Sequence, residues 1–276
     1  MNILRRVLYK GRKFYDDDFD WNNYTADSYA RRLKGDIEAH YETAIDVAAT
    51  KVDRVAGHVD FQSVQVHPNV QLIMNTVARL APTSVHEVGC GGGDHIANVK
   101  RLFPDIIATG GDRSENQLRF ALERHPDLAK GFGVQDITMP FSQLWPRAEL
   151  VYSQAVVMHI HTAVSHFVAL TNMVRMAQKY VLLVENLQAH NFVSDLRALY
   201  EGGQLDWETM NIYAVDGREG ARAILLSREA LDLPVIHSDA EIRAGQKASA
   251  RRLKRADQDS ATGTFGFAAA KAAPPR

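Results

Sequence analysis

The chain has 276 residues, 46% of them apolar, and a formal net charge of −1 at pH 7. This is enough for one large α/β domain with appendages, whereas two full catalytic domains would be crowded. The balanced charge gives no overall attraction to nucleic acid or to a membrane surface. The single cysteine, Cys90, excludes an internal disulfide bond. With no apolar run of membrane-spanning length and no signal-peptide pattern, we expect a cytoplasmic protein.

The first 66 residues divide into two segments. Residues 1–20 join a basic cluster to an acidic one, which predicts a flexible charged leader. Residues 21–66 begin with apolar and aromatic side chains at intervals of three to four residues as far as Val52, and Thr25 is an N-cap candidate. This pattern predicts one or two helices, followed by a loop from Gly57 to His67.

From residue 67 onward, helical and extended patterns alternate. We predict helices at 68–82, 94–103, 114–125, 162–177 and 192–200, and strands at 84–88, 105–111, 131–135, 149–154 and 180–185. Such alternation indicates a doubly wound, mostly parallel sheet. Two further extended stretches flank the turn DGREG and predict an antiparallel hairpin. Residues 237–276 lack apolar periodicity and are predicted to form a disordered basic tail.

The stretch SVHEVGCGGGD, from Ser84 to Asp94, combines an apolar run, an acid and a glycine-rich turn. Gly89, Gly91 and Gly93 stand at alternate positions, which allows a tight turn and the close approach of a ligand. A helix that begins near Asp94 would point its N-terminus at that ligand. The dinucleotide pattern G-x-G-x-x-G needs glycine at the position of Asp94, so the sequence disfavours an NAD site.

The segment EVGCGGG, followed downstream by GGDRS, resembles the first two motifs of the class I S-adenosylmethionine-dependent methyltransferases. The resemblance covers roughly residues 69–233. It implies a Rossmann-like fold with a mostly parallel seven-stranded sheet, a C-terminal antiparallel hairpin and an N-terminal helical lid at 21–66. It also implies a methyltransferase domain at 67–236 and S-adenosyl-L-methionine as the cofactor.

The resemblance places the cofactor against the ends of the first strands. Asp112 closes the second strand, where a carboxylate can accept both hydroxyl hydrogens of a ribose. Asp136 is expected at the adenine amino group, with the neighbouring backbone beside it, and Glu87 near the methionine amino group. The cofactor-binding residues that we expect are Glu87, Gly89, Cys90, Gly91, Gly93, Asp112, Arg113, Asp136, Ile137, Gln154 and Tyr24.

The fourth strand and the residues after it, LVYSQAVVMHIH, carry information about the methyl acceptor. They lack the Asx-Pro-Pro-aromatic turn of the base N-methyltransferases and the Pro-Cys of the cytosine C5 enzymes, so no nucleic-acid partner is expected. The segment resembles methyltransferases that act on small molecules and glycans, and O-methylation of such an acceptor is our prediction. N-methylation of a small molecule and an inactive binding or scaffold protein remain open alternatives.

An alcohol must lose a proton as it is methylated, so a base with a pKa near the operating pH is useful. We predict that the catalytic residues are His159, His161 and Glu185. His190 is a further candidate at the same end of the sheet, and a structural role for His159 stays open.

The pair Glu185 and Asn186 resembles a magnesium-binding pair of the catechol-type O-methyltransferases. The fourth strand has Ser153 and Gln154 where that site needs an aspartate, so no metal is predicted. We expect a monomer or homodimer without an integral membrane segment. Peripheral membrane contact through the basic termini is left open.

Overall fold

The computed structural model describes residues 45, 47–48, 50–61 and 66–245, and the backbone of 261–262 and 268–269. Seven strands form one sheet in the order β5-β4-β3-β6-β7-β9-β8. Their bounds are β3 Ser84–Val88, β4 Ile107–Asp112, β5 Phe132–Val134, β6 Ala148–Gln154, β7 Ala177–Val184, β8 Asn211–Asp216 and β9 Arg222–Ser227. Only β9 runs against the other strands. The predicted mostly parallel sheet with a C-terminal hairpin is confirmed.

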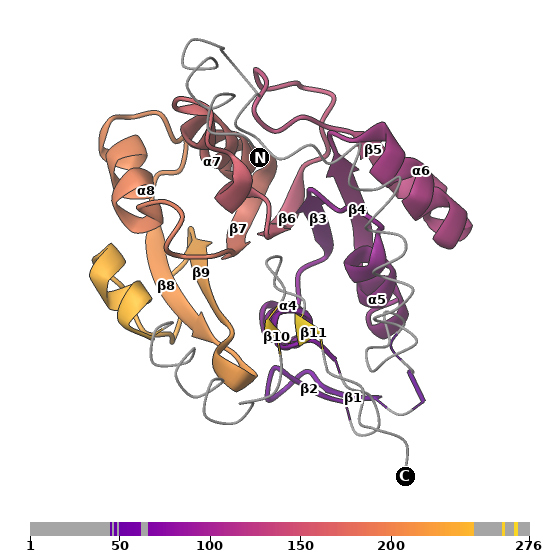
Figure 1. Cartoon of the computed structure of the whole chain (residues 1–276). Coiled ribbons are helices and arrows are strands. Elements are labelled where there is room, and N and C mark those ends of the chain that lie inside the picture. The colour runs from indigo at the N-terminus through magenta and orange to yellow at the C-terminus, as the bar shows by residue number, and fades with distance from the viewer. Residues whose placement is uncertain are drawn as a thin grey trace.

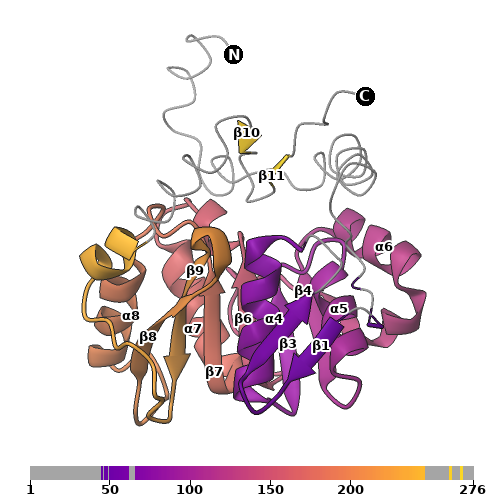
Figure 2. The same cartoon turned by 90° about the horizontal axis from the view of Figure 1, so that it is seen from below.

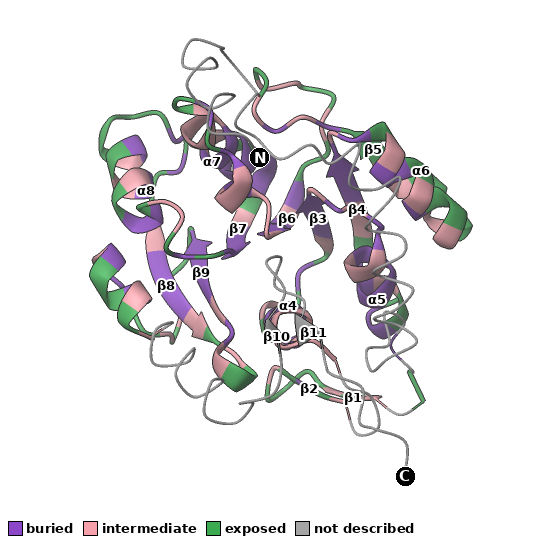
Figure 3. Cartoon of the chain, in the orientation of Figure 1, coloured by how far each residue is buried: buried purple, intermediate pink, exposed green. Residues whose placement is uncertain are grey.

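Helices cover both faces of the sheet, which explains why its central strands β3, β6 and β7 are largely buried. The helices are α4 Pro68–Leu80, α5 Asp94–Leu102, α6 Glu115–Arg124, α7 Ser165–Met176 and α8 Phe192–Glu201. Helices α4 and α5 bury their apolar sides on one face and α7 and α8 on the other (Figure 1, Figure 2). Figure 3 shows the strands largely buried, whereas the helices keep exposed outer faces.

The parallel strands end at a common edge, which we call the carboxyl edge. In β3, Glu87 lies between Gly110 of β4 and Tyr152 of β6, and Tyr152 lies beside Leu182 of β7. The loops that follow β3, β4, β5, β6 and β7 therefore emerge side by side. Ligands of open α/β sheets bind at this edge, so it is where we look for the site.

The described part of the N-terminal segment contains two strands where we predicted helix and loop. β1 (Thr50–Asp53) and β2 (His58–Phe61) pair antiparallel, and β2 packs against α4. Exposure alternates residue by residue in β1, which is the period of a strand. The prediction is wrong at these residues, because the short alternation was read as the end of a helical pattern. The leader and residues 21–44 lie outside the described residues.

The predicted disordered tail also needs correction. Residues 239–245 are helical, and Ile242 is buried. The Asp239 carboxylate accepts hydrogen bonds from the backbone N–H groups of Val193 and Ser194 at the start of α8. Ser238 and Glu241 form a capping box, S-x-x-E, a sequence pattern that could have predicted this helix. Further on, strands β10 (Ala261–Thr262) and β11 (Ala268–Ala269) pair antiparallel.

A chain that ends at His237 is expected to be less stable than one that ends at Gly245 by about 2 kcal/mol or more. Burial of an isoleucine side chain contributes roughly 1.5 to 3 kcal/mol, and the cap that Asp239 provides for α8 is lost as well. Urea unfolding of the two truncated chains measures the difference. Equal unfolding free energies would show that residues 238–245 do not stabilise the domain.

Candidate functional site

The glycine-rich turn between β3 and α5 adopts the backbone conformation that its sequence predicts. Gly89, Gly91 and Gly93 have φ values of 69°, 51° and 78°, in the left-handed region that favours glycine. The N–H groups of Gly89 and Cys90 both donate to the carbonyl of Gly111 in β4, at 2.7 and 3.0 Å. The turn is thus fixed to the neighbouring strand, and α5 starts directly after it.

The absence of a side chain at Gly89 lets the turn after β6 come close. A Cβ atom on Gly89 would lie 2.3 Å from Cγ2 of Val156, well inside the limit for any real contact. Val156 therefore packs directly on the glycine turn. Two loops of the carboxyl edge, one after β3 and one after β6, form a single surface.

Asp112, the last residue of β4, connects the glycine turn to the start of α6. Its carboxylate accepts hydrogen bonds from the N–H of Gly91 at 3.0 Å and from the N–H of Ser114 at 2.8 Å. Burial raises the pKa of Asp112, although these two N–H groups favour the charged form. Each oxygen of a carboxylate can accept a second hydrogen bond, so the geometry fits the hydroxyl pair of a ribose.

Glu87 lies buried beneath the turn and is paired with a residue that the sequence analysis missed. One carboxylate oxygen is 2.6 Å from Nδ1 of His95, and the other accepts from the Tyr152 hydroxyl at 3.4 Å. Burial raises the pKa of Glu87. Burial also opposes the charged imidazole of His95, but the Glu87 carboxylate outweighs it and the pKa of His95 is raised. The first turn of α5 therefore carries a histidine that favours its charged form.

A second cluster holds the turn from the outside. Arg124 of α6 forms an ion pair with Asp94 and donates to the carbonyl of Gly92, and His125 lies 3.2 Å from the Asp94 carboxylate. Asp94 occupies the position where a dinucleotide site would have glycine. Its carboxylate stabilises the first turn of α5, as an acid near a helix N-terminus does. Arg124 lies 30 residues after Asp94 in the sequence, and no local pattern links the two, so this ion pair was not predicted.

Most of the remaining predicted cofactor residues lie at the carboxyl edge. Asp136 and Ile137 follow β5 and Gln154 ends β6, all at the carboxyl edge, and Arg113 directly follows Asp112. The side chain of Asp136 accepts from the N–H and the hydroxyl of Thr138, which fixes its orientation. Tyr24 lies outside the described residues.

Cys90, one of the predicted cofactor-binding residues, has a buried side chain. The Cys90 side chain packs against Gly110, where an added Cβ would lie 2.8 Å from Cys90 Cβ. The backbone N–H of Cys90 donates to the carbonyl of Gly111. Burial holds the pKa of the thiol well above its usual range. Cys90 therefore fills space beneath the turn and is no nucleophile.

Glu185, which follows β7 and was predicted as a catalytic residue, is bonded to the turn after β6. Its carboxylate accepts from the Ser153 hydroxyl at 2.7 Å and from the backbone N–H groups of residues 156–158 at 3.0 to 3.2 Å. These bonds hold a turn in which Ala155 has a φ of 55°, a conformation that costs about 1 to 3 kcal/mol for a residue with a side chain. The carboxylate thus accepts hydrogen bonds from the protein itself, and its role as a catalytic base stays a prediction.

Histidines gather at the carboxyl edge beyond β6 and β7. The predicted His159 ends the short helix η3 (Val157–His159) and is half-buried, and His161 is exposed. The ring of His161 lies 5.6 Å from that of His190, and the ring of His190 stacks on that of His166 at 4.4 Å and 8°. The sequence placed three of these four residues at this edge, and His166 was missed.

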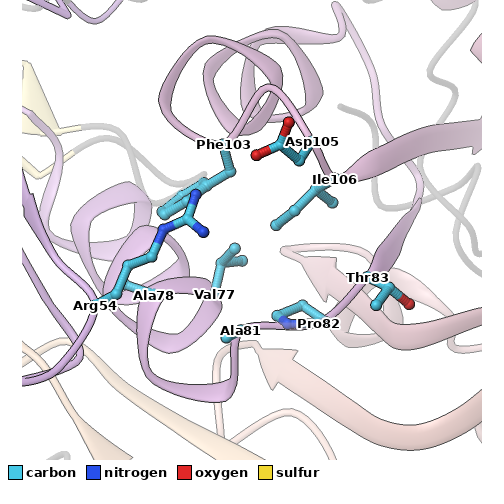
Figure 4. Close-up of a pocket in the computed structure, with 9 residues that line it drawn as sticks. All are labelled: Arg54, Val77, Ala78, Ala81, Pro82, Thr83, Phe103, Asp105 and Ile106. Carbon is cyan, nitrogen blue, oxygen red and sulfur yellow. The ribbon is translucent and has the colours of Figure 1, made fainter.

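Two other kinds of feature, a metal-ion cluster and a membrane-spanning helix, are absent from the described part of the chain. It contains no group of three or more histidine, cysteine, aspartate or glutamate side chains placed to hold a metal ion. None of its helices is both long and apolar enough to cross a bilayer. A small pocket lined by Val77, Phe103, Ile106 and others lies where the chain enters β3 and β4 (Figure 4). That is the edge opposite the glycine turn, so the pocket is separate from the candidate site.

No protein-family model matches the sequence, and no curated protein matches it. Among solved structures, a TehB-like SAM-dependent methyltransferase from Corynebacterium glutamicum superposes with a TM-score of 0.50 at 14% identity, over 75% of this chain and 100% of that one. Magnesium protoporphyrin IX methyltransferase from Synechocystis PCC 6803, with bound SAM, gives 0.46 at 16% identity, over 75% and 95%. The chain thus has the class I methyltransferase fold.

Proposed function

We propose that this chain is a cytoplasmic S-adenosylmethionine-dependent methyltransferase that methylates a hydroxyl group of a small molecule or glycan. The observation that carries the proposal is the glycine turn at the carboxyl edge. It has three glycines in the left-handed conformation, one of which, Gly91, donates its N–H to the Asp112 carboxylate, and Glu87 lies beneath it. A scaffold that had lost activity would need neither the glycine turn nor a buried acid at the end of β4.

The residues present fit the proposed cofactor. Asp112 would hold the ribose hydroxyls, and Asp136 with the backbone of Ile137 would meet the adenine. The Glu87 carboxylate would offset positive charge near the methionine end. The cofactor supplies an electrophilic methyl group on a sulfonium, so the protein needs chiefly to exclude water and to orient the acceptor.

The acceptor side of the proposal rests on the histidines. A hydroxyl must give up its proton during transfer, and the carboxyl edge offers histidine side chains that could accept it. His159 and His161, on the turn after β6, are two candidates for this base. An amine that arrives without its proton would need no base, so replacing these histidines also separates O-methylation from N-methylation.

Replacing Asp112 with alanine is expected to weaken binding of S-adenosylhomocysteine about 10- to 100-fold. Hydrogen bonds to a charged group contribute roughly 1.5 to 3 kcal/mol each, and about 1.4 kcal/mol corresponds to a factor of ten. Isothermal titration calorimetry on the full chain measures the change. The matched control is Asp127→Ala, because Asp127 is an exposed aspartate of the turn after α6.

The same calorimetry tests the cofactor class. The unmodified chain should bind S-adenosylhomocysteine and give no heat with NAD. Binding of NAD alone would overturn the proposed function, and an unchanged affinity in Asp112→Ala would move the ribose contact to another residue. Mass analysis of a metabolite extract incubated with isotopically labelled cofactor would then identify the methylated atom.

A further inference from the structure

His190 is held in one defined orientation at the carboxyl edge. Its Nε2 lies 3.1 Å from the carbonyl oxygen of Val157, on the turn after β6. A carbonyl oxygen can only accept a hydrogen bond, so Nε2 must carry the proton. In the neutral ring the lone pair then resides on Nδ1, and no described residue donates a hydrogen bond to that atom. The backbone of another loop thus fixes the tautomer of this histidine.

Packing fixes the plane of the ring as well. His166 of α7 stacks in parallel on one side at 4.4 Å, and Phe192, the first residue of α8, meets the ring edge-on at 5.5 Å. The guanidinium of Arg243 donates to the His190 carbonyl at 2.8 Å and so holds the main chain. Because the ring is restrained on several sides, the side chain loses little conformational entropy when it takes part in a reaction.

The position of His190 is connected to the glycine turn through two contacts. Val157 accepts the hydrogen bond from His190, and its neighbour Val156 packs on Gly89. The same turn is bonded to Glu185, which follows β7 and precedes His190 by five residues. The loops after β3, β6 and β7 are therefore one unit, which places the ring beside the proposed cofactor site.

We infer that His190 is the catalytic base and that Nδ1 takes the proton of a neutral hydroxyl acceptor, an inference that rests on the proposed function. The hydroxyl oxygen forms the new bond to the methyl carbon while the carbon–sulfur bond breaks, and that electron pair stays on sulfur. The hydroxyl proton passes to Nδ1, which leaves an imidazolium that returns the proton to water. The acceptor class is thus an alcohol or phenol, for which a base near neutral pKa is effective.

The charges around the ring keep it neutral before the reaction. Burial lowers the pKa of His190, and the nearby His166 and His161 lower it further, while the Val157 carbonyl and the Asp195 carboxylate oppose them. His166 in turn lies 3.4 Å from Asp195 of α8, and Arg243 contacts the His190 backbone. A neutral ring at pH 7 has its Nδ1 lone pair available, as a general base requires.

The first experiment reads the ring directly and needs no acceptor. Long-range ¹H–¹⁵N correlation spectra of the ¹⁵N-labelled full chain report which imidazole nitrogen carries the proton, and His190→Gln assigns the signal. At pH 7.5 we expect an Nε2–H tautomer with an unprotonated Nδ1, and a titration midpoint below that of a free histidine. An Nδ1–H tautomer or a charged ring at this pH would overturn the inference.

The second experiment measures transfer of tritium from methyl-labelled S-adenosylmethionine into a small-molecule metabolite extract. His190→Gln should lower incorporation per folded molecule by about 100-fold or more, because base catalysis contributes roughly 10² to 10⁴. The affinity for S-adenosylhomocysteine should stay within twofold. His58→Gln is the matched control, because His58 is an exposed histidine of β2, away from the carboxyl edge.

The outcomes separate this inference from the proposed function. If the unmodified chain does not bind S-adenosylhomocysteine, the proposed function itself fails. If it binds and label is incorporated equally by His190→Gln, only the role of His190 fails. Loss of incorporation in His159→Gln or His161→Gln, with His190→Gln unaffected, would assign the base to the turn after β6 instead.

Discussion

Replacing Glu185 with alanine is expected to lower the free energy of unfolding by about 3 to 5 kcal/mol. The change removes an acceptor that four donors share, the Ser153 hydroxyl and the N–H groups of residues 156–158. Each buried donor that loses its partner costs roughly 1 to 3 kcal/mol. The left-handed Ala155 would also lose the bonds that hold its turn. Urea unfolding followed by circular dichroism measures the loss.

Two further variants make the expectation specific. Ser153→Ala removes one of the four donors and should cost about 1 kcal/mol. Glu123→Ala alters an exposed glutamate of α6 and should leave stability unchanged. If Glu185→Ala instead kept its full stability and lost only methyl transfer, the carboxylate would be a catalytic group and the hydrogen bonds to the turn would be incidental.

The sheet and the glycine turn could be predicted because their signals are local. The strand from Ser84 to Val88 is a short apolar run, and the glycines that follow stand where the backbone needs positive φ. Asp112 was assigned from its place at the end of the next strand. The N–H groups of Gly91 and Ser114 donate to its carboxylate and hold it against the turn, and its contact with a ribose stays a prediction.

The roles of acidic and basic side chains at the edge could not be read in the same way. Glu185 and His190 follow one strand and are both chemically suited to proton transfer. What separates them is the backbone of another loop, which donates to Glu185 and accepts from His190. A sequence gives residue types and their order, but the direction of a main-chain N–H or C=O in a turn depends on the folded structure.

We expect the folded chain to lose stability in mild acid because of His86. It lies in β3 at the centre of the sheet with 1% of its surface exposed. Its Nε2 is 3.0 Å from the side-chain oxygen Oε1 of Gln135, and the side-chain Nε2 of Gln135 donates to the sulfur of Met176. Nε2 therefore carries the proton, and Nδ1 lies 2.8 Å from the Thr109 hydroxyl oxygen, whose hydrogen is donated to the Val85 carbonyl. Burial lowers the pKa of His86 to about 4.

The direction of the pH effect on stability depends on whether the folded or the unfolded chain binds the proton more tightly. Below a pH of about 6.5 the unfolded chain protonates this histidine and the folded chain does not, so folding becomes less favourable as pH falls. The contribution of His86 is complete above that pH and is lost as pH falls toward about 4. A shift of this size corresponds to roughly 3 kcal/mol. The full chain should therefore unfold at clearly lower urea concentration at pH 4.5 than at pH 7.5.

A comparison with His86→Gln isolates this residue from other groups that titrate in the same range. The pKa of His67 is also lowered to about 4, chiefly by burial and further by His95, but it stays in the variant. His86→Gln should be less stable at pH 7.5, yet the difference from the unmodified chain should shrink by about 3 kcal/mol as pH falls to 4. Parallel stability curves for the two proteins would show that burial does not hold His86 in its neutral form.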